Sequence, residues 1–299
     1  MSEELLVDKR LVRRSFDHAA ANYDDAAVLQ REVSKRMLER LQYIKIAPHA
    51  LLDAGSGTGY GSRQLLALYP KVNLLALDIA PFMLKHARAH YSAFKRKLPF
   101  FAAARERYVC GDVESLPVQS ASMGMVWSNL TIQWCNDLPA AFAEFKRVLT
   151  PGGLLMFSSF GPDTLKELRQ AFAPLDRYTH VNRFIDMHDI GDMLAHVGFA
   201  APVMDMECLT LTYDDMLGMM RDLKALGAHN MTTGRRPGLM GKTEWRALQQ
   251  NFEQFRRDGK LPATFEVIYG HAWKPEAPAK TADGRQIIKL DFKRSDKAK

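Results

Sequence analysis

The segment DAGSGTG at residues 53–59 constrains the fold more than any other part of the sequence. It follows the apolar run 50–52 and precedes a helical pattern over residues 62–69. Glycines in such a turn allow positive φ angles and let a ligand approach the backbone closely. The pattern lacks the third glycine of the dinucleotide motif GxGxxG, where Tyr60 stands, and the Gly-Lys-Ser/Thr of a P-loop. We therefore expect a strand–turn–helix unit whose ligand is not held through a phosphate.

Strand and helix patterns continue to alternate up to about residue 160. They are recognised by short apolar runs and by apolar residues at three- and four-residue spacing. The predicted elements are, in turn, strand 72–78, helix 81–91, strands 107–112 and 123–129, helix 138–149 and strand 154–159. Such alternation predicts a parallel sheet with right-handed crossovers. Because the strands are apolar throughout, we expect helices on both faces of the sheet.

The two ends of the chain depart from this alternation. Beyond residue 160 the segment 161–197 is polar with a helical pattern, and 227–262 is long, basic and rich in glycine. The other elements predicted by periodicity are helices within 5–45, strand 204–213, helices 214–226 and 243–257, and strand 265–273.

Three acidic residues stand at the ends of successive predicted strands. Asp53 precedes the first glycine and suits an ammonium or sulfonium charge, and Asp78 is placed to accept hydrogen bonds from ribose hydroxyls. Asp112 can accept an adenine amino group, beside the apolar Val113. A single Asp after a strand is more often a turn or cap residue. Three of them, with the glycine loop, predict a cationic nucleoside cofactor at the carboxyl edge of the sheet.

Composition excludes several classes of protein. Apolar residues make up 47% of the 299 residues and charged residues 25%, as in ordinary globular enzymes. The sequence contains no apolar run of the roughly 20 residues that a membrane helix needs, and its start has no apolar signal core. We therefore expect a cytoplasmic protein. The three cysteines form no CxxC pair, so we expect buried free thiols rather than a disulfide or zinc site.

The net charge of +7 is concentrated in three basic segments, 85–107, 221–260 and 275–299. Aromatic residues are not interleaved with the basic ones, so neither a nucleic acid nor a membrane is the expected partner. Solvated faces are the ordinary explanation of such segments. An acidic protein partner is the alternative for the two internal ones.

The motifs at the strand ends resemble those of the class I S-adenosylmethionine-dependent methyltransferases. These motifs are DAGSGTG, Asp78 and GDVE at 111–114. Other stretches are similar to the malonyl-acyl carrier protein O-methyltransferases of biotin synthesis: FDHAAANY at 16–23, SNLTIQWC at 128–135, RVLTPGG at 147–153, LKELRQAF and DRYTHVNRF up to 184, MRDLKALGAHN at 220–230 and LPATFEVIYG at 261–270. The resemblance implies a Rossmann-like seven-stranded, mostly parallel sheet with an antiparallel last strand.

The resemblance also implies how the chain is divided. Residues 1–47 would form a helical cap over the cofactor, and 48–274 the methyltransferase domain. Within that domain, 161–200 and 227–262 would be inserted segments that cover the substrate. Residues 275–299 would form a basic, loosely held tail.

The resemblance implies two sets of site residues and no metal. The residues expected to bind S-adenosylmethionine are Gln30, Arg31, Asp53, Gly55, Gly57, Gly59, Asp78, Ile79, Asp112, Val113, Asn129 and Leu130. Those expected to position the substrate are Tyr23, Gln133, Trp134, His180, Arg183 and Arg221. The arginines are candidates for a carboxylate clamp. A catalytic base is not expected, because a malonyl carboxylate is already ionised at neutral pH.

Simpler roles remain open for several of these residues. They are an exposed helix face for Gln30 and Arg31, packing for Tyr23 and Trp134, a structural hydrogen bond for His180, and a surface position for Arg183 and Arg221. The implied partner is malonyl-acyl carrier protein, an acidic protein expected to dock on 221–260. The alternatives are a methyltransferase for another small carboxylate or a quinone precursor, an assembly factor that hydroxylates a partner's arginine, and a module that only senses the cofactor.

Overall fold

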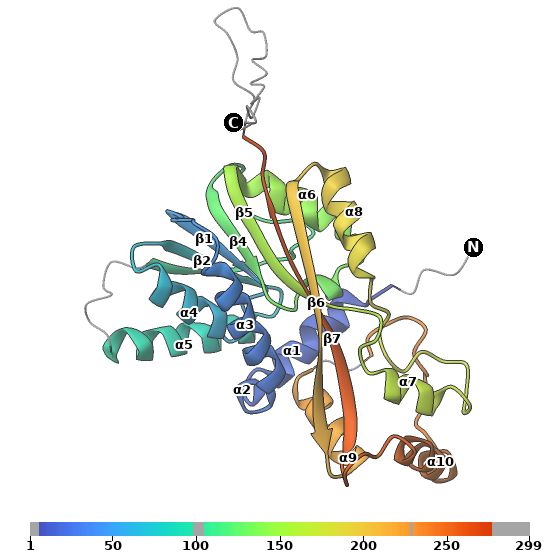
Figure 1. The fold of residues 1–299 in the computed structure, drawn as a ribbon. Helices are drawn as coiled ribbons and strands as arrows, with labels where there is room; N and C mark the ends of the chain where they lie inside the picture. Colours follow the sequence, from blue (N-terminus) through green and yellow to red (C-terminus); the bar gives the residue numbers. More distant parts are fainter. Residues whose placement is uncertain (1–5, 98–104, 228–229, 277–299) are drawn as a thin grey trace, which may run out of the picture.

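The computed structural model describes residues 6–97, 105–227 and 230–276. They build a seven-stranded sheet in the order β3-β2-β1-β4-β5-β7-β6 (Figure 1). Its strands are β1 (Ala50–Ala54), β2 (Asn73–Asp78), β3 (Arg105–Cys110), β4 (Met123–Ser128), β5 (Leu149–Phe160), β6 (Ala200–Tyr213) and β7 (Leu261–Trp273). Only β7 runs antiparallel to its neighbours. The predicted fold class, including the reversed last strand, is confirmed.

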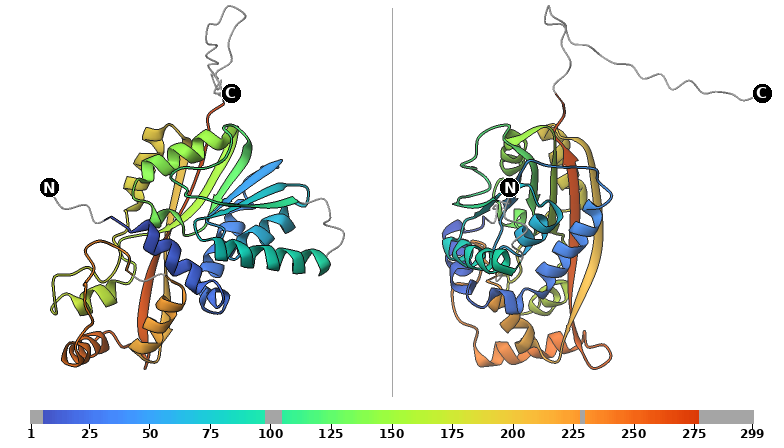
Figure 2. Two further views of the ribbon diagram at one scale, coloured as in Figure 1. Left: turned by 180° about the vertical axis from the view of Figure 1, so that it is seen from behind. Right: turned by 90° about the vertical axis from the view of Figure 1, so that its left-hand side faces the viewer.

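Helices cover both faces of this sheet. They are α1 (Lys9–Ala19), α2 (Tyr23–Ala26), α3 (Val28–Leu41), α4 (Tyr60–Leu68), α5 (Pro81–Lys97), α6 (Leu138–Val148), α7 (Lys166–Phe172), α8 (Met187–Val197), α9 (Met216–Ala225) and α10 (Lys242–Glu253). Helices α3, α4 and α5 lie on one face, and α6 and α8 on the other (Figure 2). Side-chain caps define several helix starts: the Asp8 carboxylate, for example, accepts hydrogen bonds from the backbone N–H groups of Arg10 and Leu11.

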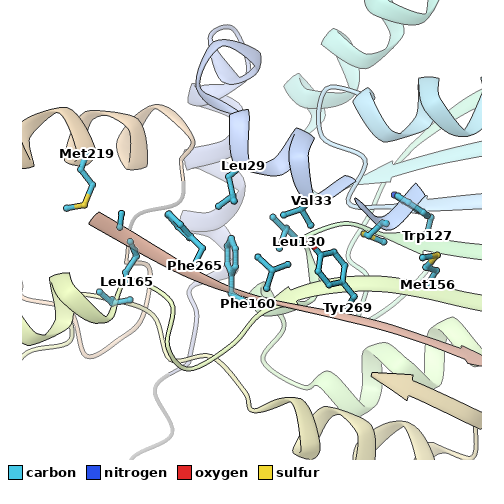
Figure 3. Close-up of a cluster of buried hydrophobic side chains, with 14 of the residues drawn as sticks. Leu29, Val33, Trp127, Leu130, Met156, Phe160, Leu165, Met219, Phe265 and Tyr269 are labelled. Carbon is cyan, nitrogen blue, oxygen red and sulfur yellow. The ribbon is translucent and has the colours of Figure 1, made fainter. Parts of the chain in front are cut away.

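The central strands are buried on both sides. Leu51 packs against the α3 and α4 side, and the next residue, Leu52, packs against α6 on the other face. Figure 3 shows part of the first cluster, in which Val33 of α3 lies near Tyr269 of β7. The edge strand β6 does not follow the expectation of double coverage. Its side chains are half-buried or exposed along its length, and they alternate between the two states over residues 207–213, so one face of the strand is open to solvent there.

Strands β6 and β7 are longer than the rest of the sheet. Strand β5 pairs with β7 only over 267–273, whereas β6 pairs with it down to Tyr213 opposite Leu261. The remaining two-stranded extension reaches past the sheet to α7 and α9 (Figure 1). Gly270 allows β7 to cross β5 closely, since a Cβ there would stand 2.2 Å from the ring of Phe157. The extension forms one wall of a cavity described below.

The structure also places the predicted inserted segments and the cysteines. Segment 161–200 contains α7 and α8, and 227–262 contains α10. Residues 277–299 of the predicted tail lie outside the described residues. The expectation of buried thiols is wrong for Cys110 and Cys208, which are exposed and lie on the two edge strands, β3 and β6. Within the described part of the chain, no helix has the length and apolar character needed to cross a membrane.

Candidate functional site

The glycine loop turns sharply where β1 meets α4. Gly55 has a φ of +81°, and a Cβ there would stand 2.0 Å from Oγ1 of Thr131. Gly59 also has a positive φ and is the N-cap residue of α4. Gly57, with a φ of +53°, has no atom within 4 Å of its would-be Cβ. Side chains are therefore excluded at Gly55 by contact, whereas Gly57 presents bare backbone to open space.

Two buried carboxyl groups flank this loop. The Asp78 carboxylate accepts hydrogen bonds from the backbone N–H groups of Gly57, at 2.9 Å, and Ala80, at 2.8 Å. The Asp53 carboxylate accepts one from the Ser62 hydroxyl at 2.6 Å. Burial raises the pKa of Asp78 to about 6 and that of Asp53 to about 7, in spite of these hydrogen bonds. Both groups would be stabilised as anions by a cationic or hydrogen-bonding ligand.

Two adjacent cavities lie along the carboxyl ends of the strands. The strand-end cavity is lined, among others, by Tyr23, Gly57, Asp78, Ile79, Asp112, Val113, Leu130 and Trp134. The loop cavity is lined, among others, by Tyr23, Gln30, Arg31, Asp53, Gly57 and Asn129. The two cavities share Tyr23 and Gly57. The structure thus brings together all the residues expected at the cofactor, with Gly55 and Gly59 shaping the loop behind them.

Helix α1 closes the strand-end cavity and contributes a residue that the sequence analysis missed. The Lys9 ammonium lies 3.0 Å from the Asp112 carboxylate and also contacts Glu114. Burial lowers the pKa of Lys9, but the hydrogen bonds with these two carboxylates outweigh it, and the pKa is raised. Phe16 of the same helix packs edge-on against Trp134 at 5.5 Å. More than 100 residues separate Lys9 from Asp112, so no local pattern could have linked them.

The end of β4 is held in an unusual backbone conformation. Leu130 has a φ of +50°, rare for a residue with a side chain. Its N–H donates to the Ser158 hydroxyl at 2.9 Å, and this hydroxyl donates to Asn129 Oδ1 at 2.8 Å. Asn129 Nδ2 in turn donates to the Gln30 carbonyl at 3.1 Å, which ties β4 to α3. The Asn129 side chain is therefore used within the protein, and its backbone carbonyl accepts a hydrogen bond from the Thr131 hydroxyl at 3.2 Å.

A third, larger cavity, here called the outer cavity, adjoins the other two. Its walls come from the start of α3, the end of β5, the β6–β7 extension and α9, and they include Gln30, Trp134, Phe160, Asn182, Thr212, Tyr213, Asp222, Leu223 and Phe265. Burial, together with Asp222, raises the pKa of Tyr213 to about 12. Apolar and uncharged side chains dominate this lining.

Two residues join the outer cavity to the cofactor side. Trp134 lines both the outer and the strand-end cavities, and Gln30 lines both the outer and the loop cavities. Gln30 Oε1 is buried without a hydrogen-bond partner among the described residues. A ligand along the strand ends and a second one in the outer cavity would therefore meet beside Gln30 and Trp134.

The other residues expected at the substrate lie elsewhere. His180 stacks on Phe172 at 3.6 Å, and its Nε2 lies 2.8 Å from Asp176 Oδ1, so it has the structural hydrogen bond named as its alternative. Gln133 Nε2 donates to the Leu130 carbonyl at 2.7 Å, within the 3₁₀ turn Ile132–Trp134. Neither residue is part of the described lining of the three cavities.

The expected arginine clamp is also not assembled. Arg183 and Arg221 are both exposed. Arg221 lines a surface groove on the far side of α9, together with residues of α1. Among the described residues, the outer cavity is lined by neither Arg nor Lys. The described residues likewise include no group of three or more His, Cys, Asp or Glu side chains arranged to hold a metal ion.

Comparisons with known proteins agree with this geometry. Residues 52–157 match the family described as Methyltransferase domain. The malonyl-acyl-carrier protein O-methyltransferase of Gallionella capsiferriformans is 59% identical over 290 residues, which cover 97% of this chain and 99% of that protein. The corresponding enzyme of a Methylovorus species is 56% identical over 97% of both chains.

Similar solved structures show the fold alone. A putative methyltransferase from Bacillus halodurans superposes with a TM-score of 0.56 at 17% identity, covering 80% of this chain and 98% of that one. The YcgJ protein from Bacillus superposes with a TM-score of 0.55 at 16% identity, covering 81% and 98%.

Proposed function

The chain belongs to the malonyl-acyl-carrier protein O-methyltransferase family, and from that premise we propose that it methylates the free carboxylate of a malonyl group carried on acyl carrier protein. The methyl donor is S-adenosylmethionine, and the ester formed enters biotin synthesis in the cytoplasm. The observation that carries the proposal is that a carboxylate-lined cofactor site and a largely apolar outer cavity share the residues Gln30 and Trp134.

The chain's own residues fit S-adenosylmethionine. The Asp78 carboxylate would accept hydrogen bonds from the ribose hydroxyls, and Asp112 from the adenine amino group, whose ring Val113 and Ile79 would flank. Asp53, buried beside the bare backbone of Gly57, would face the positive charges of the methionine end. Bound there, the cofactor supplies a methyl group on a sulfonium centre.

Gln30 and Arg31 of α3 would complete the methionine end. Arg31 donates to the carbonyl of Asp24, which holds its guanidinium against the loop cavity. Its other N–H groups would face the methionine carboxylate. Tyr23 stays a neutral hydroxyl, because burial, and then the negative charge of Asp78, raise its pKa.

The acceptor needs positioning and desolvation rather than a base. Its carboxylate is an anion at neutral pH, so no proton has to be removed. Gln30 Nε2, and not the acceptor Oε1, can donate a hydrogen bond to one oxygen, while Trp134 and Phe160 exclude water from the reacting pair. Holding two reactants in line contributes up to about 7–11 kcal/mol to a two-reactant step. An adjacent Arg would stabilise the negative charge that methylation neutralises, and would thus stabilise the ground state more than the transition state.

Mass spectrometry of malonyl-acyl carrier protein after incubation with S-adenosylmethionine tests the proposal. We expect a gain of one methyl group on the malonyl carboxylate and one S-adenosylhomocysteine formed per ester. Free malonate and a quinone precursor are the matched acceptors. Preferential methylation of either would contradict the carrier-bound substrate. Cofactor binding without turnover, or an oxygen added to a partner protein, would contradict methyl transfer itself.

A further inference from the structure

A basic groove runs over the outer surfaces of α1 and α9. Arg14 and His18 of α1 face it from one side, and Arg221 and Lys224 of α9 from the other. Figure 2 shows both helices, α1 in dark blue and α9 in orange. Arg14 and His18 also line a second hollow on the other side of α1, together with Arg10 and Arg13 of that helix. All six side chains are exposed.

Most of this positive charge is not neutralised within the protein. The structure records no ion pair between Arg14, Arg221 or Lys224 and any acid among the residues that it describes. The acid of α1, Asp17, lies 3.9 Å from Arg13 and accepts a hydrogen bond from the backbone of Phe82. An unpaired cation keeps its full charge for a partner, apart from screening by salt.

The inserted segment 227–262 is neutralised in part: three of its seven cations are in ion pairs, whereas Arg235, Lys242, Arg246 and Arg257 are in none among the described residues. Arg236 pairs with Glu244 at 2.9 Å, Arg256 with Glu253 at 2.7 Å, and Lys260 with Asp214 at 2.5 Å. Lys242 and Arg246 are exposed on α10. That helix packs on α7 and contributes no described residue to the three cavities. Its free cations are therefore remote from the place where ligands meet.

The groove, in contrast, lies directly behind both ligand sites. Helix α9 presents Arg221 and Lys224 to the groove, and Leu223 and Leu226 to the outer cavity. Helix α1 likewise presents Arg14 to the groove and Phe16 to the strand-end cavity. A protein bound in the groove would be one helix away from both the methyl donor and the acceptor cavity.

We propose that the α1–α9 groove is the docking surface for the acidic carrier protein, and that the inserted segment 227–262 is not. The proposal rests on the proposed function for the identity of the partner. Charge complementarity of this kind acts mainly on the rate of encounter and depends on ionic strength. The carrier's acidic surface would bind the groove, and its acyl arm would pass around the contact between α2 and α9 to reach the outer cavity.

Charge reversal in the groove tests this assignment. The variant Arg14→Glu/Lys224→Glu should raise the KM for malonyl-acyl carrier protein about tenfold or more at low salt, with kcat nearly unchanged. The KM for malonyl-pantetheine, which lacks the protein, should stay within about twofold. The dissociation constant of S-adenosylmethionine, measured by calorimetry, should also stay unchanged and thus report an intact fold. Lys242→Glu/Arg246→Glu on α10 is the matched control, with two exposed cations reversed.

The outcomes separate the docking proposal from the proposed function. A rise in the carrier KM for the groove variant alone, which added salt reduces, supports the groove. A rise for the α10 variant instead, or equal KM values in all three proteins, overturns it while leaving carrier methylation intact. Failure of the unmodified protein to methylate either malonyl thioester overturns the proposed function, and the docking proposal with it.

Discussion

The cofactor side and the outer cavity are built in opposite ways. The cofactor side gathers the carboxylates of Asp53, Asp78 and Asp112 at the ends of neighbouring strands, the first two buried and the third half-buried, around a bare glycine loop. The outer cavity is largely apolar, and its walls come from stretches of chain spread between α2 and β7. One side is made to hold a charged ligand through polar contacts. In the proposed function, the other excludes water from the acceptor anion and binds this anion through neutral donors.

Removing a carboxylate should affect only the cofactor side, and this is the largest expected effect. Asp78→Ala removes a buried acceptor that also fixes Gly57. We expect the dissociation constant of S-adenosylmethionine to rise about thirtyfold or more, as the loss of about 2 kcal/mol of charged hydrogen bonding implies. Calorimetry at neutral pH measures it. Native affinity in a folded variant would remove Asp78 from the ribose site.

The raised pKa values predict a pH dependence confined to the cofactor side. In the free protein, burial raises the pKa of Asp53 to about 7, so the native state holds a proton that the unfolded chain has already lost. This group's contribution to stability is complete below the ordinary pKa of Asp and is lost as the pH rises to about 7. A cationic ligand favours the ionised group, so cofactor affinity should change in the opposite direction.

We expect the affinity for S-adenosylmethionine to rise about tenfold between pH 6 and pH 8, as one ionisation with a pKa near 7 requires. In Asp53→Asn this rise should be much smaller. The same steep rise in both proteins would assign it to another group. Calorimetry in two buffers of different ionisation enthalpy would count the protons released on binding.

The residue at the junction should show a smaller effect on the acceptor. Gln30→Leu keeps a side chain of similar size but removes the donor. We expect kcat/KM for malonyl-acyl carrier protein to fall about fivefold, as the loss of one neutral hydrogen bond of about 1 kcal/mol implies. Arg183→Ala, at an exposed position, is the control and should change kcat/KM less than about twofold. A larger fall in kcat/KM for Arg183→Ala than for Gln30→Leu would instead support the arginine clamp.

The two regions also differ in how far the sequence revealed them. Apart from Gln30 and Arg31 of α3, each residue expected at the cofactor stands at a strand end or in the adjoining loop, so identifying the strands was enough to place Asp78 and Gly57. The cap residue Lys9 escaped notice, because its contact with Asp112 spans 103 residues. No comparable sequence pattern identified the residues that line the outer cavity. Its substrate residues were expected from the kinds of side chain, and Arg221 proved to lie on the other face of its helix.

The sequence by itself determined where the glycines and carboxylates stand relative to the strands. It therefore predicted which edge of the sheet binds a cofactor. Local periodicity and turn chemistry are sufficient for this, since each motif spans only a few residues. Only the tertiary structure decided which face of α9 turns inward. Leu223 and Leu226 lie toward the outer cavity because their apolar surface is removed from water there, and this leaves Arg221 and Lys224 outside. Whether a cationic side chain of a helix points to solvent or to a cavity thus depends on which face of the helix is buried. That face is set by contacts with elements far along the chain.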